Sequence, residues 1–196
     1  MRNRLMSRQD AEELSLEERI AMEVQITDER AKAELPEIPA GWKFDDYASH
    51  NPWRRKMFTH LGPLEGRKIL DVGCGWHPTP LLFALAGAEM VATASSAAAL
   101  NYVPRSAEHN GVAARITTQV CPAEAMPFED DEFDLVHGEG LLHHLVPDDA
   151  GREISRVLKP GGKGAFKDPF GQNPVLEFAR DHLPYAWKGD HKGTDH

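Results

Sequence analysis

The chain reads KILDVGCG at residues 68–75. The apolar run at its start ends in the acidic Asp71, a pattern typical of a buried strand. Gly73 and Gly75 follow, and glycine permits a positive φ and leaves no Cβ in the way of a ligand. An apolar segment at residues 80–86 then predicts a helix. A strand, a glycine turn and a helix in this order are the usual cradle of a nucleotide-like molecule.

Strands and helices are expected to alternate over the rest of the chain. The pattern predicts strands at residues 68–72, 89–93, 115–120, 133–137 and 163–167, and helices at about 79–87, 96–110, 148–157 and 173–183. Such alternation implies parallel strands joined by right-handed crossovers, with helices on both faces of the sheet. The predicted fold is therefore α/β, with a doubly wound, mostly parallel sheet. A ligand of such a sheet binds beyond the carboxyl ends of its strands.

The N-terminal part predicts a further helix, within residues 9–35. Apolar residues recur at every fourth position from Leu16 to Val24, and Ser15 and Glu18 have the spacing of a capping box. Such a helix is either a solvated, charged helix with one apolar face or a lid over the ligand site. A Pro- and Gly-containing linker follows it. The expected organisation is an N-terminal helical extension over residues 1–60 and an α/β domain over residues 61–196.

Composition narrows the classes of function. The chain of 196 residues suits a single apolar core, and its formal net charge of −9 argues against a broad nucleic-acid-binding surface. No signal peptide and no apolar run of membrane-spanning length is evident. Cys74 and Cys121 form neither a disulfide framework nor a metal motif, so two reduced thiols are expected. These features predict a cytoplasmic protein that binds neither nucleic acid nor membrane.

Four further segments share their order and spacing with one enzyme family. They are MPF at residues 126–128, DEFDLV at 131–136, LLHHL at 141–145 and RVLKPGG at 156–162. Together with the glycine turn, they make residues 64–170 resemble the class I S-adenosylmethionine-dependent methyltransferases. The resemblance implies a Rossmann-like fold, S-adenosylmethionine as cofactor and a small molecule as methyl acceptor.

The resemblance also implies an open sheet edge. The family usually adds two strands as an antiparallel C-terminal hairpin, whereas residues 183–196 are polar and rich in His, Gly and Asp. The hairpin is therefore expected to be missing. Two explanations stay open: either the chain has been shortened, or the edge is closed in another way, such as by a homo- or hetero-oligomer that covers it.

The resemblance assigns cofactor contacts to the ends of four strands. The expected contacts are Asp71, Gly73, Gly75, Ser95, Ser96, Ala123, Glu124 and His137. Three positions depart from the family pattern: His77 replaces a third glycine, Ala94 replaces the acid that binds the ribose, and Pro122 replaces an Asp that often binds the adenine.

The segment VHGEGLLHH at residues 136–144 carries the candidate bases. Glu139 and His143 are expected to take a proton from the nucleophile, because a carboxylate or an imidazole at a strand end can do so near neutral pH. His144 has a structural interpretation as a helix-start residue. The scattered residues His77, His137, Glu139 and Asp168 leave a metal site as an alternative, without a tight ligand motif.

The sequence therefore predicts an S-adenosylmethionine-dependent methyltransferase that acts on a small molecule. Two alternatives stay open at this point. One is a catalytically impaired, methyltransferase-like accessory or binding protein, which Ala94 and Pro122 suggest. The other is a metal-assisted enzyme of another class that reuses the fold.

Overall fold

The computed structural model describes residues 14–31, 51–75 and 77–168. The expected helix at 173–183 and the C-terminal residues bearing on the family's hairpin lie outside these ranges. The elements in chain order are α2 (Leu16–Ala31), α4 (Pro52–Leu61), β1 (Lys68–Asp71), α5 (Thr79–Leu85), β2 (Glu89–Ala94), α6 (Ala97–Leu100), α7 (Tyr102–His109), η1 (Ala113–Arg115), β3 (Ile116–Val120), β4 (Phe133–Glu139), η2 (Leu142–His144), α8 (Pro147–Val157) and β5 (Leu158–Lys167).

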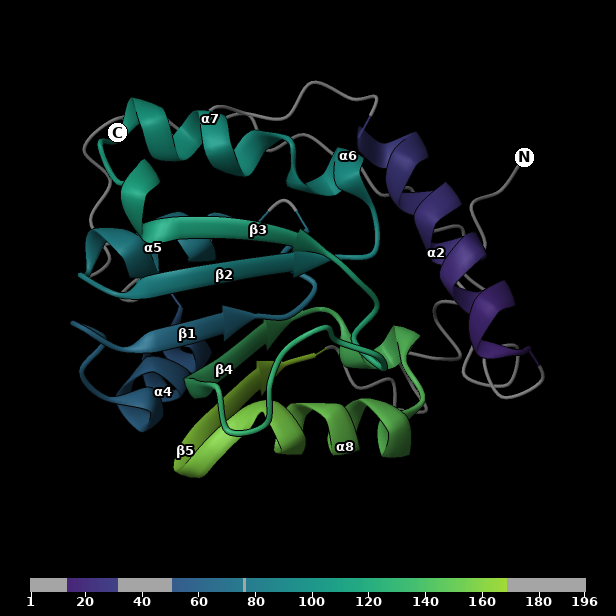
Figure 1. Cartoon of the computed structure of the whole chain (residues 1–196). Coiled ribbons are helices and arrows are strands. Elements are labelled where there is room, and N and C mark those ends of the chain that lie inside the picture. The colour runs from purple at the N-terminus through teal and green to yellow at the C-terminus, as the bar shows by residue number, and fades with distance from the viewer. Residues whose placement is uncertain (1–13, 32–50, 76, 169–196) are drawn as a thin grey trace.

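The five strands form one sheet in the order β3-β2-β1-β4-β5, and every neighbouring pair is parallel (Figure 1). The expected α/β fold with a parallel sheet is thereby confirmed. From β1 the chain builds outward through β2 to β3 and then returns to place β4 on the other side of β1. Ligands of open α/β sheets bind at this kind of switch point, outside the carboxyl ends of the strands.

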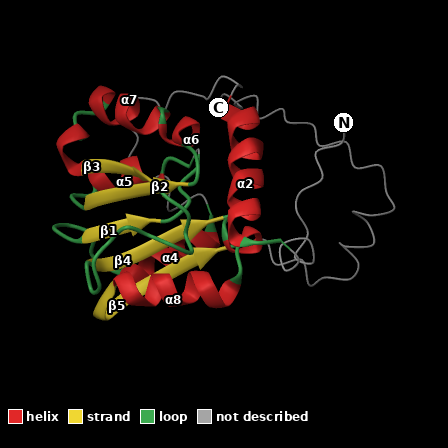
Figure 2. Ribbon diagram, turned by 45° about the vertical axis from the view of Figure 1, so that its right-hand side comes forward, coloured by secondary structure: helices red, strands yellow, loops and turns green. Residues whose placement is uncertain are grey.

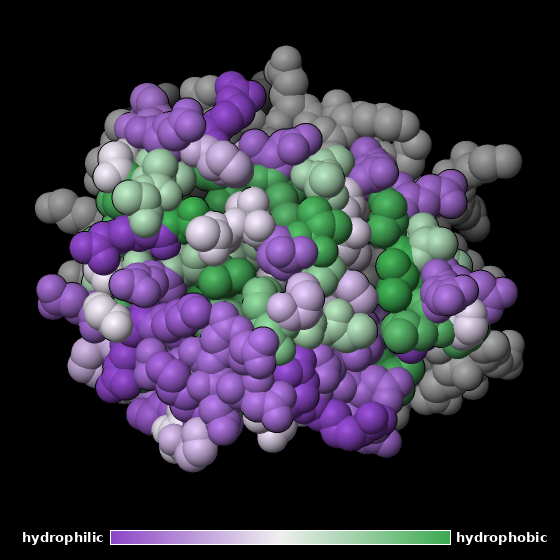
Figure 3. Space-filling view, viewed as in Figure 1, coloured by the Kyte–Doolittle hydropathy of each residue, from purple (hydrophilic) through white to green (hydrophobic). Residues whose placement is uncertain are grey.

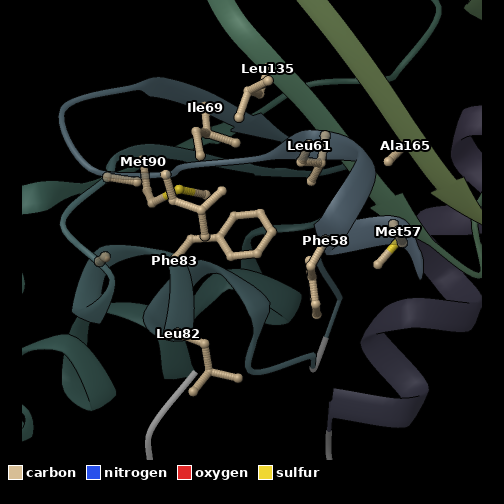
Figure 4. Close-up of a cluster of buried hydrophobic side chains, with 12 residues drawn as sticks. Met57, Phe58, Leu61, Ile69, Leu82, Phe83, Met90, Leu135 and Ala165 are labelled. Atoms are coloured by element: carbon tan, nitrogen blue, oxygen red, sulfur yellow. The ribbon is translucent and has the colours of Figure 1, made fainter. Parts of the chain in front are cut away.

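Helices lie on both faces of the sheet. On one face, α4 and α5 enclose a core in which Phe58 and Phe83 meet edge to face, with ring centroids 5.4 Å apart (Figure 4). On the other face, buried side chains of α8 pack against β1 and β4. This second face is less covered over β2 and β3, where Figure 3 shows hydrophobic residues gathered above a hydrophilic lower part. Val120 of β3 is 45% exposed.

Helix α2 begins with the expected capping box. The Ser15 backbone N–H donates to Glu18 Oε2 at 2.9 Å, and the Glu18 N–H donates to Ser15 Oγ at 3.3 Å. Figure 2 shows α2 standing across the carboxyl-terminal ends of the strands, so the helix faces the side of the sheet where a ligand is expected.

Helix α4 was not expected from the sequence. Asn51 caps it by accepting from the Trp53 N–H at 2.9 Å, and Pro52 occupies its first position. An Asn-Pro pair at a helix start is a recognisable signal. The buried side of α4 belongs to the core of the sheet, and the expected division between residues 60 and 61 falls on its last turn.

Two expected elements have different bounds. The predicted helix at 96–110 is divided into α6 and α7, because Pro104 lacks an N–H and its ring would clash with the carbonyl of Leu100 in a continuous helix. Strand β5 begins at Leu158, directly after α8, instead of at residue 163. Its pairing with β4 is interrupted near Lys159–Gly162, where Gly161 has a φ of 76°, so the expected turn is a bulge within the strand.

Both cysteines are buried and free. Burial raises the pKa of Cys121 to about 11, and burial together with the Asp71 carboxylate raises the pKa of Cys74. The thiols are therefore protonated and unreactive at neutral pH. Across the described ranges, the helices are too short or too polar to span a bilayer.

Candidate functional site

A hollow of about 160 Å³ opens at the carboxyl ends of four strands. Its wall comes from the turn after β1, the residues after β2 and β3, the end of β4 and the short helix η2. The lining residues are Gly73, Gly75, His77, Ala94, Ser95, Ala99, Cys121, Ala123, Glu139, Gly140, Leu141, His144 and Leu145. The hollow lies where the topology of the sheet predicts a ligand site.

The two glycines of the β1 turn have different roles. Both have a positive φ, of 62° for Gly73 and 49° for Gly75. A Cβ on Gly73 would lie 2.5 Å from Leu141 Cδ1, so a larger residue would press Leu141 out of place. A Cβ on Gly75 would meet only the Gly73 carbonyl oxygen, at 3.8 Å, so the space above Gly75 is open. This turn gives a ligand close access to the backbone.

Four of the expected cofactor contacts line the hollow, namely Gly73, Gly75, Ser95 and Ala123. The side chains of the other four are used by the protein itself. His137 and Asp71 bond to each other, Ser96 bonds to α2, and Glu124 forms an ion pair with α2. Of the expected bases, Glu139 lines the hollow, and the side chain of His143 lies outside what the structure describes.

Asp71 and His137 form a buried pair beneath the hollow. His137 Nδ1 lies 2.7 Å from Asp71 Oδ1, and both side chains are 1% exposed. The imidazole stacks on Phe58 with ring centroids 6.2 Å apart and meets Phe83 edge to face at 5.2 Å. In this structure the His137 ring lies between two phenylalanines in the α4–α5 layer, and its expected contact with a cofactor stays a prediction.

Glu139 is the centre of a cluster of basic side chains. Its carboxylate forms a two-point ion pair with Arg54, at 3.1 Å from Nε and 3.2 Å from Nη2. His77 Nδ1 and Lys167 Nζ each lie 3.5 Å from Glu139 Oε2. The Glu139 side chain is only 2% exposed, so these partners take the place of its hydration.

This cluster controls the protonation of its members. Burial by itself raises the pKa of Glu139, but the hydrogen bonds and charges of Arg54, with His77 and Lys167, outweigh burial and hold this pKa below its ordinary value. A carboxylate stabilised in this way is a weak base. Burial lowers the pKa of His77 despite the opposing Glu139 and Asp71 carboxylates, so its imidazole is neutral at neutral pH. The role of Glu139 as a general base stays a prediction, and the geometry favours an electrostatic anchor.

Two contacts attach α2 to the rim of the hollow. Arg19 Nη1 lies 2.9 Å from Glu124 Oε1, and the two side chains are 6% and 4% exposed. Ser96 Oγ donates to Asp28 Oδ1 and also accepts from the Ala98 N–H at 3.1 Å. A buried ion pair is costly to form and costlier to break on one side, so Arg19 fixes where α2 lies.

Sequence reasoning missed four residues that contact the strand ends of the site. Three of them, Arg19, Asp28 and Arg54, lie on N-terminal helices, and the fourth, Lys167, is the last residue of β5. No periodicity or spacing links a residue on an N-terminal helix to a strand end more than 60 residues later. For Arg54 alone a local signal existed, since the Asn51-Pro52 cap would have placed it on a helix.

Of the four residues of the metal alternative, His77 and Glu139 lie together, at 3.5 Å, but His137 and Asp168 bond elsewhere. Within the described ranges, no three His, Cys, Asp or Glu side chains are placed to hold a metal ion. His137 bonds to Asp71, Glu139 bonds to Arg54, and Asp168 accepts from the Leu142 N–H at 2.6 Å.

Comparisons with known proteins agree with this geometry. Residues 70–166 match the family of methyltransferase domains. Methyltransferase GfsG of Streptomyces halstedii is 31% identical over 115 residues, which are 58% of this chain and 41% of that protein. The ubiquinone/menaquinone biosynthesis C-methyltransferase UbiE of Cellvibrio japonicus is 31% identical over 137 residues, 68% of this chain and 51% of that protein. The chain thus spans about half the length of the curated relatives that it matches.

Solved structures show the same fold. The YcgJ protein of Bacillus subtilis superposes with a TM-score of 0.59 at 27% identity, over 68% of this chain and 57% of that chain. Geranyl diphosphate C-methyltransferase of Streptomyces coelicolor superposes with a TM-score of 0.54 at 21% identity, over 57% and 43% of the two chains. From its strand order, its glycine turn and these matches, the chain belongs to the class I S-adenosylmethionine-dependent methyltransferase family.

Proposed function

We propose that this chain transfers a methyl group from S-adenosylmethionine to a small molecule. The observation that carries the proposal is the hollow above Gly73 and Gly75, which lies where the carboxyl ends of β1, β2, β3 and β4 meet. Relatives whose names state an acceptor include quinone and sterol C-methyltransferases. One relative is a tRNA carboxymethyltransferase, but a net charge of −9 disfavours a tRNA substrate here.

The chemical nature of the residues that line the hollow suits a nucleoside. The glycine turn exposes backbone, and Ala94, Ala99 and Ala123 give small, apolar walls for an adenine ring. The hollow, of about 160 Å³, is smaller than the usual ligand pocket of about 300–1,000 Å³.

The cofactor, when bound, supplies the methyl group, and the chain supplies position and electrostatics. Gly73 and Gly75 offer backbone at the bottom of the hollow, while α2 stands across the strand ends and shields them from water. Glu139 holds Arg54 and Lys167 at one side of the hollow, where their charges can orient an acceptor. The imidazole of His77 is neutral and lies in the wall of the hollow, so it can take a proton from the molecule that receives the methyl group.

Calorimetric titration with S-adenosylhomocysteine tests the proposal. Binding with a dissociation constant well below about 1 mM, or better than about −4 kcal/mol, is the expected result. Absence of binding at that concentration would overturn the enzymatic function. It would instead favour a methyltransferase-like binding protein, an alternative that rests on the occupation of Ser96 and Glu124 by α2.

An oligomer that covers the free edge of β5 belongs to the same proposal. Among the described strands, β5 pairs with β4 alone, and its other edge meets no strand. A strand edge with unpaired backbone groups is a natural place for another chain to dock.

Glu139→Gln is expected to lower the free energy of unfolding by about 2 kcal/mol at about pH 7, because it weakens charge-assisted bonds to Arg54. The pKa of Glu139 is lowered in the folded protein, so its contribution is present above the ordinary pKa of 4.5 and is lost as the pH falls through the folded value. Urea unfolding at about pH 7 and about pH 3 checks this, since the difference from wild type should shrink in acid. Glu17→Gln on the exposed side of α2 is the control. An equal loss at both pH values would contradict the prediction.

A further inference from the structure

A nucleoside bound in this hollow needs an acceptor for its ribose hydroxyls. In doubly wound sheets, a carboxylate about 20 residues after the glycine turn usually takes this role, at the end of the second strand. Here Ala94 ends β2 and lines the hollow, with its side chain 5% exposed. A methyl group accepts no hydrogen bond, so the strand itself does not supply this contact.

A carboxylate does lie beside the end of β2, but it comes from α2. Asp28 Oδ1 accepts from the hydroxyl of Ser96, which is two residues after Ala94 and is 3% exposed. Ser96 is fixed in turn because it caps α6, its Oγ accepting from the Ala98 N–H. The hydroxyl therefore holds the Asp28 carboxylate at Ser96, two residues beyond the position where the strand lacks an acid, and neither Asp28 nor Ser96 is among the residues that line the hollow.

The N-terminal part of α2 is also held by a buried contact. Arg19 and Glu124 form the buried ion pair at the far end of the helix, after β3. Nine residues of α-helix separate Arg19 from Asp28, which is about 13.5 Å. Helix α2 thus reaches from the end of β3 to the start of α6, and Figure 1 shows its later residues beside α6. The helix is attached at both ends of the region that a nucleoside would cover.

We propose that Asp28 on α2 is the ribose-binding carboxylate of this protein, in place of an acid at Ala94. The inference rests on the proposed function. An ionised carboxylate has about four acceptor positions, so Asp28 keeps capacity for hydroxyls while it accepts from Ser96. Under this assignment the nucleoside site is complete only when α2 is seated. The helix is then a specificity element as well as a cover.

The test is a binding cycle with two ligands, S-adenosylhomocysteine and its 2′-deoxyribose analogue, measured by calorimetry. Wild type should bind the deoxy analogue about tenfold or more weakly, since a hydrogen bond to a charged group is lost. Asp28→Asn should weaken S-adenosylhomocysteine by a similar factor and remove most of the difference between the two ligands. Glu17→Gln, on the exposed side of the same helix, should behave as wild type.

A variant that moves the carboxylate from α2 to the end of β2 gives the most direct test. Asp28→Asn combined with Ala94→Asp should recover affinity for S-adenosylhomocysteine and restore discrimination against the deoxy analogue. Asp28→Glu, which keeps the charge, should retain part of that discrimination. Circular dichroism melts of every variant confirm that α2 and the sheet are folded.

Each other outcome has a defined meaning. If wild type binds and Asp28→Asn binds both ligands as wild type does, Asp28 is not the acceptor and the proposed function stands. If Asp28→Asn weakens both ligands equally, the residue acts only by seating α2, and the inference is again overturned. If wild type binds neither ligand, the proposed function fails with it.

Discussion

A His137→Ala variant is expected to lose about 3–5 kcal/mol of the free energy of unfolding, a large share of the stability of a domain of this size. His137 Nδ1 lies 2.7 Å from Asp71 Oδ1, and both side chains are 1% exposed. Its removal leaves the Asp71 carboxyl buried without that partner. It also leaves a cavity between Phe58 and Phe83, which now pack on the imidazole.

Urea denaturation with a linear extrapolation measures this loss. His109→Ala, at an exposed histidine on α7, is the matched control and should change stability by less than about 0.5 kcal/mol. The double variant Asp71→Ala with His137→Ala should cost less than the sum of the single changes, because no orphaned carboxyl remains. A loss below about 1 kcal/mol in His137→Ala would show that the pair contributes little.

Gly73→Val should abolish ligand binding, with a loss of at least about 100-fold, or about 2.7 kcal/mol. The backbone at Gly73 has a φ of 62°, which a β-branched residue adopts only with strain. The new Cβ would also lie 2.5 Å from Leu141 Cδ1. Leu141 lines the hollow, so its displacement changes the shape of the space in which the nucleoside is proposed to bind.

Gly66→Val separates strain from obstruction. Gly66 has a similar φ of 68°, but a Cβ there would meet nothing within 4 Å. Both variants should therefore lose stability through the backbone, while only Gly73→Val should lose S-adenosylhomocysteine in calorimetric titration. Normal binding by Gly73→Val would mean that the ligand does not rest on the β1 turn, and the proposed site would be wrong.

The sequence was sufficient for the sheet and for the place of the site. Each described strand was anticipated, although β3 is mostly polar, and the glycine turn marked the end of β1 where the hollow lies. The differences in bounds have local causes that propensity alone does not weigh. Pro104 divides one helix, and the bulge near Gly161 lets β5 begin at Leu158 instead of after the glycines.

The roles of individual side chains were harder to predict. His137 and Glu124 stand at the strand ends that a cofactor would use, yet the fold supplies each with a partner from elsewhere in the chain. His137 has Asp71 as its partner because side chains alternate along a strand, and this alternation places both residues on the α4–α5 face of the sheet. The role of Glu124 depends on its long-range ion pair with Arg19 of α2, which no local pattern in the sequence indicates.

The strand order also determines when β1 can complete its pairing during protein synthesis. Ile69 pairs with Leu135, which lies 66 positions later in the chain. At about 5–20 residues per second, a ribosome needs about 3–13 s to make that interval. During this time the newly made β1 has an unpaired edge, and Glu139 and Leu141 do not yet exist to close the crevice. A growing chain therefore cannot bind its ligand until β4 has been made. A chain that stalls earlier keeps an unpaired edge of β1, where another chain can associate wrongly.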